Sequence, residues 1–371
     1  MRSWNSITLG EVLPFKYGKN LPASKRTHSG EYDVVSSAGI IDSHDTAFTT
    51  EPCIVIGRKG SIGSLTYCPD PVWPTDTTFY VTGTPYCDLR FGYYVLQTLP
   101  LNQMNNDSAV PGLNRNDAES LAFSLPPVSE QKTIAKVLSS FDDKIAANQR
   151  TIQSADSLRN ALWDKLLKTN TESLPLSSLA EFINGRAFTK NATGTGRVVA
   201  RIAELNSGIG SNTVFNDIEV HQNHVVLPGE LLFAWSGTLM TKRWPYDEAI
   251  VNQHIFKVLP ISKFDLWALE LIIQSQIHYF QMIAAGKATT MGHIKRADLD
   301  KTVEVPTSIP DKLNMLGNTL WMLATQAEQE NQTLARTRDE LLPLLMSGKI
   351  TVRDAEEASA EVGVDKHEVE E

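Results

Sequence analysis

Apolar residues recur in steps of three and four along two long stretches of the chain. The first stretch runs from about 129 to 167 and the second from about 311 to 346. A mean spacing of 3.5 residues keeps the apolar side chains on one stripe, which faces a partner helix. A helix of about 40 residues is about 60 Å long and cannot bury its stripe alone. We therefore predict two long helices that pack antiparallel as a coiled coil.

We call the interface between these two helices the seam. Asn148 occupies a position where the repeat expects an apolar residue. A polar residue in the seam can fix its register, and a local irregularity that faces solvent is the alternative. The predicted seam residues are Ile134, Leu138, Phe141, Ile145, Ile152 and Leu162 in the first helix and Leu316, Leu320, Leu323, Leu334 and Leu341 in the second.

The two helices and the segments before them repeat one another. Arg115-Asn116-Asp117 before the first helix matches Arg296-Ala297-Asp298 before the second. Near the start of each half a glycine precedes a basic residue, as Gly18-Lys19 and as Gly185-Arg186. Self-similarity at a nearly constant offset is typical of a duplicated unit. We infer that each half is a globular region followed by a long helix.

Short β-branched and aromatic runs alternate with Gly, Pro, Asn and Asp in both globular regions, which indicates strands joined by turns. The predicted fold class is α+β, with two similar globular α/β domains separated by two long antiparallel coiled-coil helices and related by an internal pseudo-two-fold duplication. The predicted domains are a globular domain at 1–125, a central helix at 126–173, a second globular domain at 174–305, a distal helix at 306–350 and an acidic tail at 351–371.

The net charge of -9 belongs mostly to that tail. Eight acids and one base between Asp354 and Glu371 account for -7, so residues 1–353 carry about -2. An acidic segment with few aromatic residues is typical of disorder, which we predict for the tail. The folded part is close to neutral, so its charge neither supports nor excludes nucleic-acid binding.

Cysteine content and hydropathy indicate the compartment. Cys53, Cys68 and Cys87 are an odd number without a CxxC pair, and we interpret them as free thiols in a reducing compartment. No stretch approaches 18 apolar residues, and the first residues do not resemble a signal peptide. We therefore expect a cytoplasmic protein that does not bind a membrane.

Motifs of catalysis and of cofactor binding are absent from the sequence. The chain has no Asn-Pro-Pro-aromatic tetrapeptide for a flipped adenine, no GxGxxG and no Walker A sequence. The glycine-rich loop at 57–63 lacks the spacing of a phosphate cradle, and a tight turn between strands explains it better. The histidines of the second half lack a neighbouring cysteine pair for zinc. We expect no catalytic residue, no metal and no cofactor.

Several motifs in a fixed order resemble the specificity (S) subunit of type I restriction-modification systems, and the resemblance covers nearly the whole chain except the tail. The order of the motifs, together with the duplication, is more specific than any one of them. They are Leu9–Glu11, Ile56–Gly63, Pro74–Phe79 and Leu125–Ala135 in the first half, and Gly229–Thr238, Asn252–Ile255 and Leu341–Ile350 in the second.

The resemblance implies a non-catalytic subunit of a complex that methylates and restricts DNA. Each globular region would be a target-recognition domain for one half of a bipartite double-stranded DNA site. The two helices would set the gap between the half-sites and dock DNA methyltransferase (M) subunits, of which we expect two. A restriction motor-nuclease (R) subunit would complete the complex.

Phosphate and base-edge contacts require Lys, Arg and small polar residues on exposed loops. The region 1–125 has nine bases and twelve acids, and the region 175–305 has twelve of each, so DNA binding would depend on local patches. A solvated surface is the alternative for any one patch. The candidate DNA-binding residues are Lys19, Lys25, Arg26, Arg58, Lys59, Ser61, Arg115, Arg186, Lys242, Arg243, Lys287, Lys295 and Arg296.

Two function classes remain open at this point. The first is the DNA sequence-specificity subunit, and the second is a coiled-coil scaffold that holds two protein-binding domains without DNA recognition. A stand-alone nuclease or methyltransferase is disfavoured by the missing motifs. The near-neutral charge further suggests that partner subunits supply much of the DNA clamp.

Overall fold

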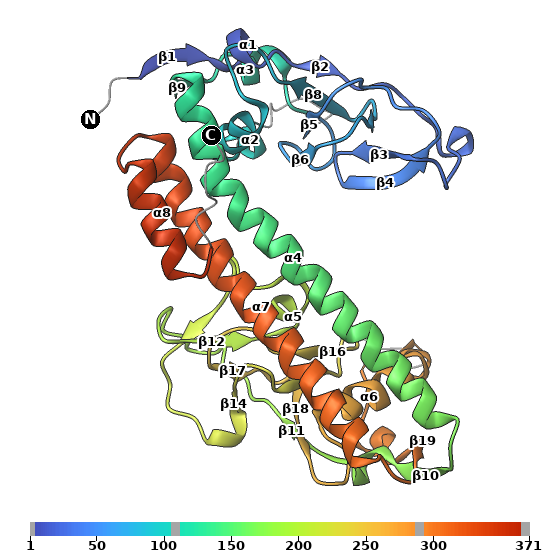
Figure 1. Cartoon of the computed structure of the whole chain (residues 1–371). Helices are drawn as coiled ribbons and strands as arrows, with labels where there is room; N and C mark the ends of the chain where they lie inside the picture. Colours follow the sequence, from blue (N-terminus) through green and yellow to red (C-terminus); the bar gives the residue numbers. More distant parts are fainter. Residues whose placement is uncertain (1–3, 105–111, 286–292, 365–371) are drawn as a thin grey trace. The chain divides into compact units, whose positions relative to one another are not determined.

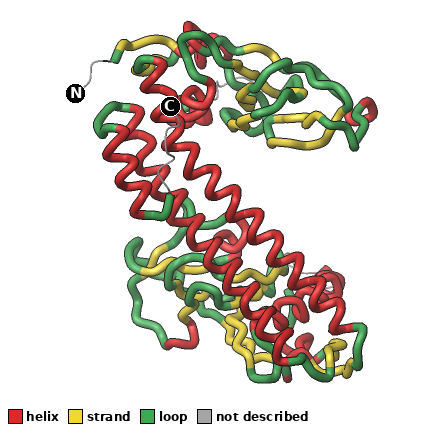
Figure 2. Tube along the Cα trace, in the orientation of Figure 1, coloured by secondary structure: helices red, strands yellow, loops and turns green. Residues whose placement is uncertain are grey.

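The computed structural model describes residues 4–104, 112–285 and 293–364. The chain forms two compact units, one of Met1–Lys144 with Leu334–Glu371 and one of Ile145–Thr333 (Figure 1). Helices and strands both contribute to each unit (Figure 2).

Two long helices, α4 (Val128–Leu167) and α7 (Asp311–Met346), match the two periodic stretches of the sequence. Within the second unit, Asn148 of α4 lies beside Glu330 of α7, and its Nδ2 donates to Glu330 Oε2 at 2.7 Å. Within the first unit, Asp142 pairs with Arg338. Within the second unit alone, Arg159 lies 5.0 Å from the centre of the Trp321 ring, while Asn148 contacts Glu330. Residue numbers rise on one helix as they fall on the other, so the pairing is antiparallel, as predicted. Asn148 is buried, which favours the register interpretation of this polar residue over a solvent-facing irregularity.

Two predicted seam residues lie on the wrong side of α7. Leu316 is 46% exposed and Leu323 is 42% exposed, which removes both from the seam. Trp321 is buried instead, and a Cβ on Gly317 would lie 2.3 Å from the Trp267 ring. These two residues set which face of α7 turns inward. The apolar cluster that α4 and α7 share consists of Ile152, Ala155, Leu320, Ala324 and Ala327.

The other predicted seam residues face inward. Ile145 is partly buried. The buried seam residues are Ile134, Leu138, Phe141, Ile152 and Leu162 on α4 and Leu320, Leu334 and Leu341 on α7.

Within residues 4–104 and 112–125, the first globular part holds three small sheets. The four-stranded sheet has the order β2-β8-β5-β6, the three-stranded sheet has the order β4-β3-β7, and β1 pairs with β9. The strands are β1 (Asn5–Thr8), β2 (Lys16–Tyr17), β3 (Tyr32–Ser36), β4 (Gly39–His44), β5 (Cys53–Gly57), β6 (Leu65–Cys68), β7 (Trp73–Pro74), β8 (Thr78–Thr82) and β9 (Ala122–Leu125). The short α-helices are α1 (Leu9–Val12), α2 (Leu89–Thr98) and α3 (Arg115–Glu119).

The second globular part has the same plan. Its sheets have the orders β11-β18-β15-β16 and β13-β12-β17-β14, and β10 pairs with β19. The strands are β10 (Thr171–Pro175), β11 (Ala180–Asn184), β12 (Arg197–Ala200), β13 (Phe215–Asn216), β14 (Val225–Val226), β15 (Leu231–Ala234), β16 (Met240–Arg243), β17 (Ala249–Val251), β18 (Ile255–Pro260) and β19 (Thr302–Pro306). The α-helices are α5 (Ile202–Ser207) and α6 (Leu266–Ala285).

The 3-10 helices of the two globular parts are short. They are η1 (Ala23–Lys25), η2 (Leu101–Gln103), η3 (Leu176–Ser178), η4 (Gln222–His224) and η5 (Arg296–Asp300).

The strand orders confirm the duplication, although the sheet β13-β12-β17-β14 has β14 at its edge as an addition to the order β4-β3-β7. β2, β8, β5 and β6 correspond to β11, β18, β15 and β16, and the parallel pair β3/β7 corresponds to the parallel pair β12/β17. The chain is therefore a mixed α/β fold with two similar globular parts and two long helices, as predicted. Repetition of a strand order that includes a parallel pair is a stronger sign of duplication than shared composition.

The acidic tail differs from the prediction. Val352–Glu361 forms helix α8, so the expectation of disorder is wrong for these residues. Thr351 caps the helix, since its hydroxyl accepts from Asp354 N and its own N–H donates to the Asp354 carboxylate. Ala355 and Val364 are buried together with the polar Ser359, and the acidic composition of the tail does not reveal this small buried face. Residues 365–371 lie outside the described part of the chain.

Candidate nucleic-acid interface

The Gly-basic step of the first half marks the end of strand β2. Gly18 N donates to Thr78 O at 3.1 Å and Lys19 N donates to Pro74 O at 2.8 Å. A Cβ on Gly18 would lie 2.0 Å from Thr75 O, so only glycine lets the strand end approach this backbone. The step thereby fixes where Lys19 leaves the sheet.

Arg58 lies beside this strand end, on the turn that joins β5 to β6. Its N–H donates to Thr77 O at 2.9 Å, and its carbonyl accepts from Leu113 N at 2.9 Å. The guanidinium carbon lies 5.3 Å from the centre of the Tyr17 ring and 5.8 Å from that of Phe79. Such a cation–π arrangement holds an arginine over aromatic faces while its N–H groups stay available.

The rest of the 57–63 loop is a tight turn, as expected from the sequence. Gly63 N donates to Gly57 O at 2.8 Å, and Gly60 and Gly63 have positive φ angles of 77° and 71°. The side chains of Lys59 and Ser61 are exposed on this turn. A basic and a hydroxyl side chain on an exposed turn are suited to phosphate contacts.

Lys19 is the second cation of this surface. Its Nζ lies 5.8 Å from the centre of the Phe48 ring and 5.9 Å from that of Trp73. Trp73 Nε1 donates to the carbonyl of Lys19 at 2.8 Å. Aromatic side chains therefore hold both Lys19 and Arg58 on one surface, which we call the first strand-end surface, made of Tyr17, Lys19, Arg58, Lys59 and Ser61.

The other candidates of the first half have neighbours of their own. Arg26 pairs with Asp42 at 3.5 Å, and Arg115 pairs with Glu119 at 3.0 Å. Lys25 is exposed. Paired arginines stabilise the loops that carry them, so Arg26 and Arg115 are weaker candidates for DNA contacts than Arg58.

The second half repeats the strand end with different side chains. Gly185 N donates to Ile255 O and Arg186 N donates to Val251 O, and a Cβ on Gly185 would lie 2.1 Å from Asn252 O. Trp235 takes the place of Arg58, and its N–H donates to His254 O at 3.1 Å. Its indole Nε1 donates to Asn184 Oδ1 at 2.8 Å.

Asn184 and Arg186 are exposed. With Trp235 and His254 they form the second strand-end surface.

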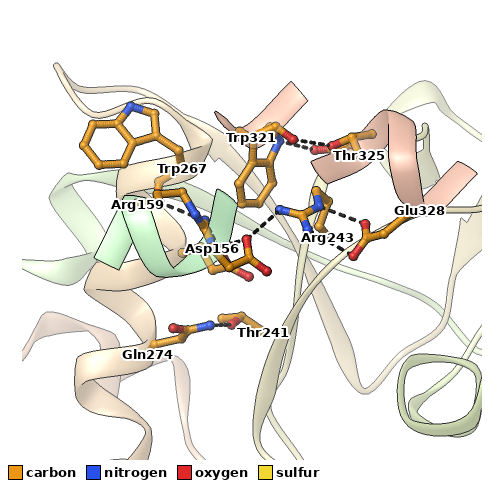
Figure 3. Close-up of polar contacts among 11 residues, drawn as sticks. Asp156, Arg159, Thr241, Arg243, Trp267, Gln274, Trp321, Thr325 and Glu328 are labelled. Atoms are coloured by element: carbon orange, nitrogen blue, oxygen red, sulfur yellow. Dashed lines mark hydrogen bonds and ion pairs between the residues drawn. The ribbon is translucent and has the colours of Figure 1, made fainter. Parts of the chain in front are cut away.

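Arg243 does not belong to any exposed surface, which corrects its prediction as a DNA-binding residue. It is 4% exposed and donates to Glu328 of α7 through Nε at 2.8 Å and through Nη2 at 3.0 Å. Its Nη1 lies 3.5 Å from Asp156 of α4, and its guanidinium lies 4.8 Å from the centre of the Trp321 ring (Figure 3). In the sequence Lys242 and Arg243 look like one exposed basic pair. In the strand β16, however, successive side chains point to opposite faces, so Arg243 is buried while Lys242 is partly exposed.

Arg159 of α4 is the second cation of this buried network. It binds Glu270 of α6 and Asp156, and it lies 5.0 Å from the centre of the Trp321 ring. Burial lowers the pKa of Arg243, but the Glu328 and Asp156 carboxylates outweigh burial and raise it above its ordinary value. Arg243 therefore keeps its charge in this buried site. The network joins the second globular part to both long helices.

The remaining candidates have less defined settings. Lys242 is partly exposed, and Lys295 and Arg296 are exposed. Lys287 lies outside the described residues. The candidate residues predicted from the sequence did not include Tyr17, Asn184 or Trp235. Tyr17 and Asn184 each directly precede the repeated Gly-basic step, and this position could have identified them. Trp235 is 51 residues from Asn184 in the chain, and the fold brings the two together.

Metal and membrane sites receive no support from the described ranges. Within residues 4–104, 112–285 and 293–364, no cluster of three or more His, Cys, Asp or Glu side chains could hold a metal ion. No helix in the same ranges is long and apolar enough to cross a membrane. All three cysteines are free and buried.

A family match is decisive for the first half. Residues 1–156 match the family model of the type I restriction modification DNA specificity domain. This stretch is therefore similar to a type I specificity domain. The resemblance predicted from the order of the motifs is thereby confirmed.

Two curated relatives agree with this assignment. The chain is 26% identical over 145 residues to the type I restriction enzyme EcoprrI specificity subunit of Escherichia coli, covering 36% of this chain and 35% of the relative. It is 25% identical over 188 residues to the putative type I specificity subunit S.MpnORF638P of Mycoplasma pneumoniae, covering 48% and 49%. The matches thus span about a third to a half of the length of these relatives.

The likeness of fold extends further than the sequence matches. The crystal structure of the type I restriction-modification system S subunit from M. genitalium is 16% identical and has a TM-score of 0.63. The superposition covers 93% of this chain and 96% of that chain. The fold around the specificity domain, including the second globular part, therefore has a known counterpart.

Proposed function

We propose that the chain is the DNA sequence-specificity subunit of a type I restriction-modification complex. The region 1–125 recognises one half of a bipartite DNA site, and the region 174–305 recognises the other. The observation that carries the proposal is the duplicated strand end, where Gly18-Lys19 and Gly185-Arg186 occupy equivalent places in a chain with a specificity domain. The chain has no catalytic role of its own.

The two surfaces support independent recognition of two half-sites. The first strand-end surface presents Arg58 and Lys19 over aromatic rings, and the second presents Asn184 and Arg186 beside Trp235. A common backbone with different side chains suits two modules that face the same kind of ligand but different sequences.

The long helices set the gap between the half-sites. Asn148–Glu330 and Asp142–Arg338 fix the antiparallel register of α4 and α7. Insertion of one heptad after Ala146 and one after Gln332 keeps both pairings. Seven residues lengthen a helix by about 10 Å, which corresponds to about three base pairs. We expect a gap longer by this amount and unchanged half-sites, and altered half-site sequences would contradict the role of the helices.

The outer face of α7 is the docking surface for a methyltransferase subunit. Met315, Leu316, Met322 and Leu323 are 71%, 46%, 56% and 42% exposed. Residues seven apart lie on one side of a helix, so these side chains form one apolar stripe. Exposed apolar stripes of this kind are typical of protein interfaces. The proposed complex provides one occupant, the M subunit, and a motor-nuclease (R) subunit joins for restriction.

The docking surface is tested by replacing Leu316 and Leu323 with Gln together. We expect loss of M-subunit capture in a pull-down and little change in the free energy of unfolding, because both side chains are exposed. Gln326→Ala, another exposed position of α7, is the matched control and retains capture. Full capture by the double variant would contradict this docking face.

The main experiment is methylation sequencing. The chain is expressed with a type I methyltransferase (M) subunit in a host without endogenous adenine methylation, and methylated adenines are mapped genome-wide. We expect one split motif that disappears when this chain is omitted. Methylation that is identical with and without the chain would contradict the proposal and favour the scaffold alternative.

A further inference from the structure

We propose that Arg58 and Asn184 are the base-reading residues of the two halves, with guanine as the target of Arg58 and adenine as the target of Asn184. Tyr17 and Trp235 are their positioning residues. The inference rests on the proposed DNA-recognition function and specifies which side chains of the two strand-end surfaces carry the sequence information.

The two pairs of residues occupy equivalent positions. Arg58 N donates to Thr77 O, and Trp235 N donates to His254 O, one residue before β8 and β18 respectively. Tyr17 pairs with Phe79 across the sheet, and Asn184 pairs with Phe256. The backbone therefore places Arg58 against Tyr17 in one half and Trp235 against Asn184 in the other.

At each strand end, a side chain of the outer strand contacts the residue that follows a neighbouring strand. The two elements are β2 and β5 in the first half and β11 and β15 in the second. In the first half it is the guanidinium of Arg58 over the ring of Tyr17. In the second half it is the hydrogen bond from Trp235 Nε1 to Asn184 Oδ1. The aromatic and the polar side chain have exchanged positions between the two halves. The polar residue follows β5 in the first half, whereas in the second half it is the last residue of β11.

Arg58 is suited to guanine. Its guanidinium carries N–H donors in a planar fork that matches the O6 and N7 acceptors of guanine in the major groove. Tyr17 is 52% exposed, so the surface that holds Arg58 lies open to solvent. The backbone bonds of Arg58 to Thr77 and Leu113 and the two rings under the guanidinium reduce the rotational freedom that binding would otherwise remove.

Asn184 is suited to adenine. Its Oδ1 accepts from Trp235 and keeps a second lone pair, and its Nδ2 carries two donors. An amide can accept from adenine N6 and donate to N7. The Trp235 ring is itself held near His254 at 5.6 Å and Phe256 at 5.8 Å. This packing fixes the indole N–H and, through it, the orientation of the Asn184 amide.

The experiment compares methylation motifs of single variants in the complete complex. Arg58→Ala is expected to make one guanine position of the first half-site degenerate, with discrimination reduced by about tenfold to a hundredfold. Asn184→Ala is expected to do the same at one adenine of the second half-site. In each case the other half-site keeps its sequence. Lys59→Ala is the control, and it lowers methylation without changing the motif.

Conservative variants separate base reading from folding. Arg58→Lys keeps the charge and most of the stem but loses the fork, so it is expected to relax the same guanine as Arg58→Ala. Trp235→Phe keeps the ring and removes the indole N–H, and it is expected to relax the adenine position of Asn184. Capture of the M subunit at the wild-type level shows that each variant is folded.

The outcomes distinguish the inference from the proposed function. A split motif in the wild type that stays unchanged in the Arg58 and Asn184 variants would overturn the inference and leave the function in place. Relaxation of both half-sites by one variant would also overturn it. Absence of any split motif in the wild type would overturn the proposed function itself.

Discussion

Arg338 on α7 donates from Nη1 to Asp142 Oδ1 on α4 at 2.5 Å. Arg159 on α4 takes the corresponding place in the other repeat and binds Glu270 of α6. Both arginines follow from the same duplicated segment, since Ser157–Leu162 resembles Arg336–Leu341 in the sequence. In each unit one arginine of a long helix is thus neutralised by a carboxylate on a neighbouring helix.

The Asp142 carboxylate contacts three partners, so we expect its removal to lower the stability of the fold strongly. It accepts from Arg338 and from the Tyr94 hydroxyl, and Arg90 lies 3.7 Å away. Loss of one member of a buried pair costs about 3–5 kcal/mol, and the partial exposure of these side chains reduces this. We expect Asp142→Asn to lower the free energy of unfolding by about 2 kcal/mol in urea denaturation.

Asp339→Asn is the matched control for this prediction. Asp339 also pairs with Arg338, at 2.8 Å, but is 61% exposed. An exposed pair contributes about 0–1 kcal/mol, so this variant should unfold close to the wild type. Equal effects of the two substitutions would show that burial does not decide the strength of the Asp142 pairing.

We expect substitution of Arg243 to lower the stability of the second unit. Arg243→Met removes the arginine that pairs with the largely buried Glu328 carboxylate and one of the two arginines beside Asp156. We expect the free energy of unfolding to fall by about 3 kcal/mol. Lys242→Met, on the opposite face of the same strand, should change it by about 0.5 kcal/mol or less. A destabilisation by Lys242→Met as large as that by Arg243→Met would contradict the assignment of faces.

Substitution of either strand-end glycine, Gly18 or Gly185, is expected to cause a steric clash. Ala at Gly18 or at Gly185 would place Cβ 2.0 or 2.1 Å from a carbonyl oxygen. We expect either substitution to destabilise its unit by about 3 kcal/mol, because the backbone has to move apart. Thermal unfolding of the two variants measures it.

Gly210→Ala serves as the control for the glycine substitutions. A Cβ on Gly210 would meet nothing within 4 Å, and no positive φ is required there. This variant should unfold like the wild type. If Gly18→Ala behaved in the same way, the close approach of the strand end to Thr75 would be excluded.

The raised pKa of the Cys87 thiol predicts that the free energy of unfolding depends on pH. Burial and then the charge of Asp88 raise the pKa of the Cys87 thiol to about 12. The folded state therefore binds the proton more tightly than the unfolded state does. The contribution to stability is complete below the unfolded pKa near 9 and is lost as pH rises toward 12, by about 1.4 kcal/mol per pH unit.

The measurement is urea denaturation of the wild type and Cys87→Ala at pH 8, 9 and 10. We expect the two proteins to lose stability at different rates above pH 9, with the smaller slope in the variant. Identical slopes would show that this thiol does not retain its proton in the folded state. Cys53 and Cys68 are present in both proteins and cancel in the comparison.

The local pattern of the sequence determined the elements and their repetition. The three-four spacing gave both long helices with ends close to those of α4 and α7, because helix periodicity is a property of neighbouring residues. The Gly-basic step in each half contributed to the evidence for the repetition. The structure then showed that this step follows the last residue of β2 and of β11, where the close approach of another backbone segment requires glycine. Repeated motifs gave the duplication, which the strand orders confirm.

Only the tertiary structure decided which faces of these elements are buried. Leu316 and Leu323 fit the heptad pattern as well as Leu320, but Trp321 and Gly317 pack against other parts of the chain and rotate the buried stripe. Arg243 resembles an exposed base in sequence, and its carboxylates come from 85 and 87 residues away. Arg58 and Tyr17 meet because β2 and β5 flank β8 in one sheet. Such contacts depend on which distant segments share a sheet or a helix pair, and periodicity along the chain carries no information about that.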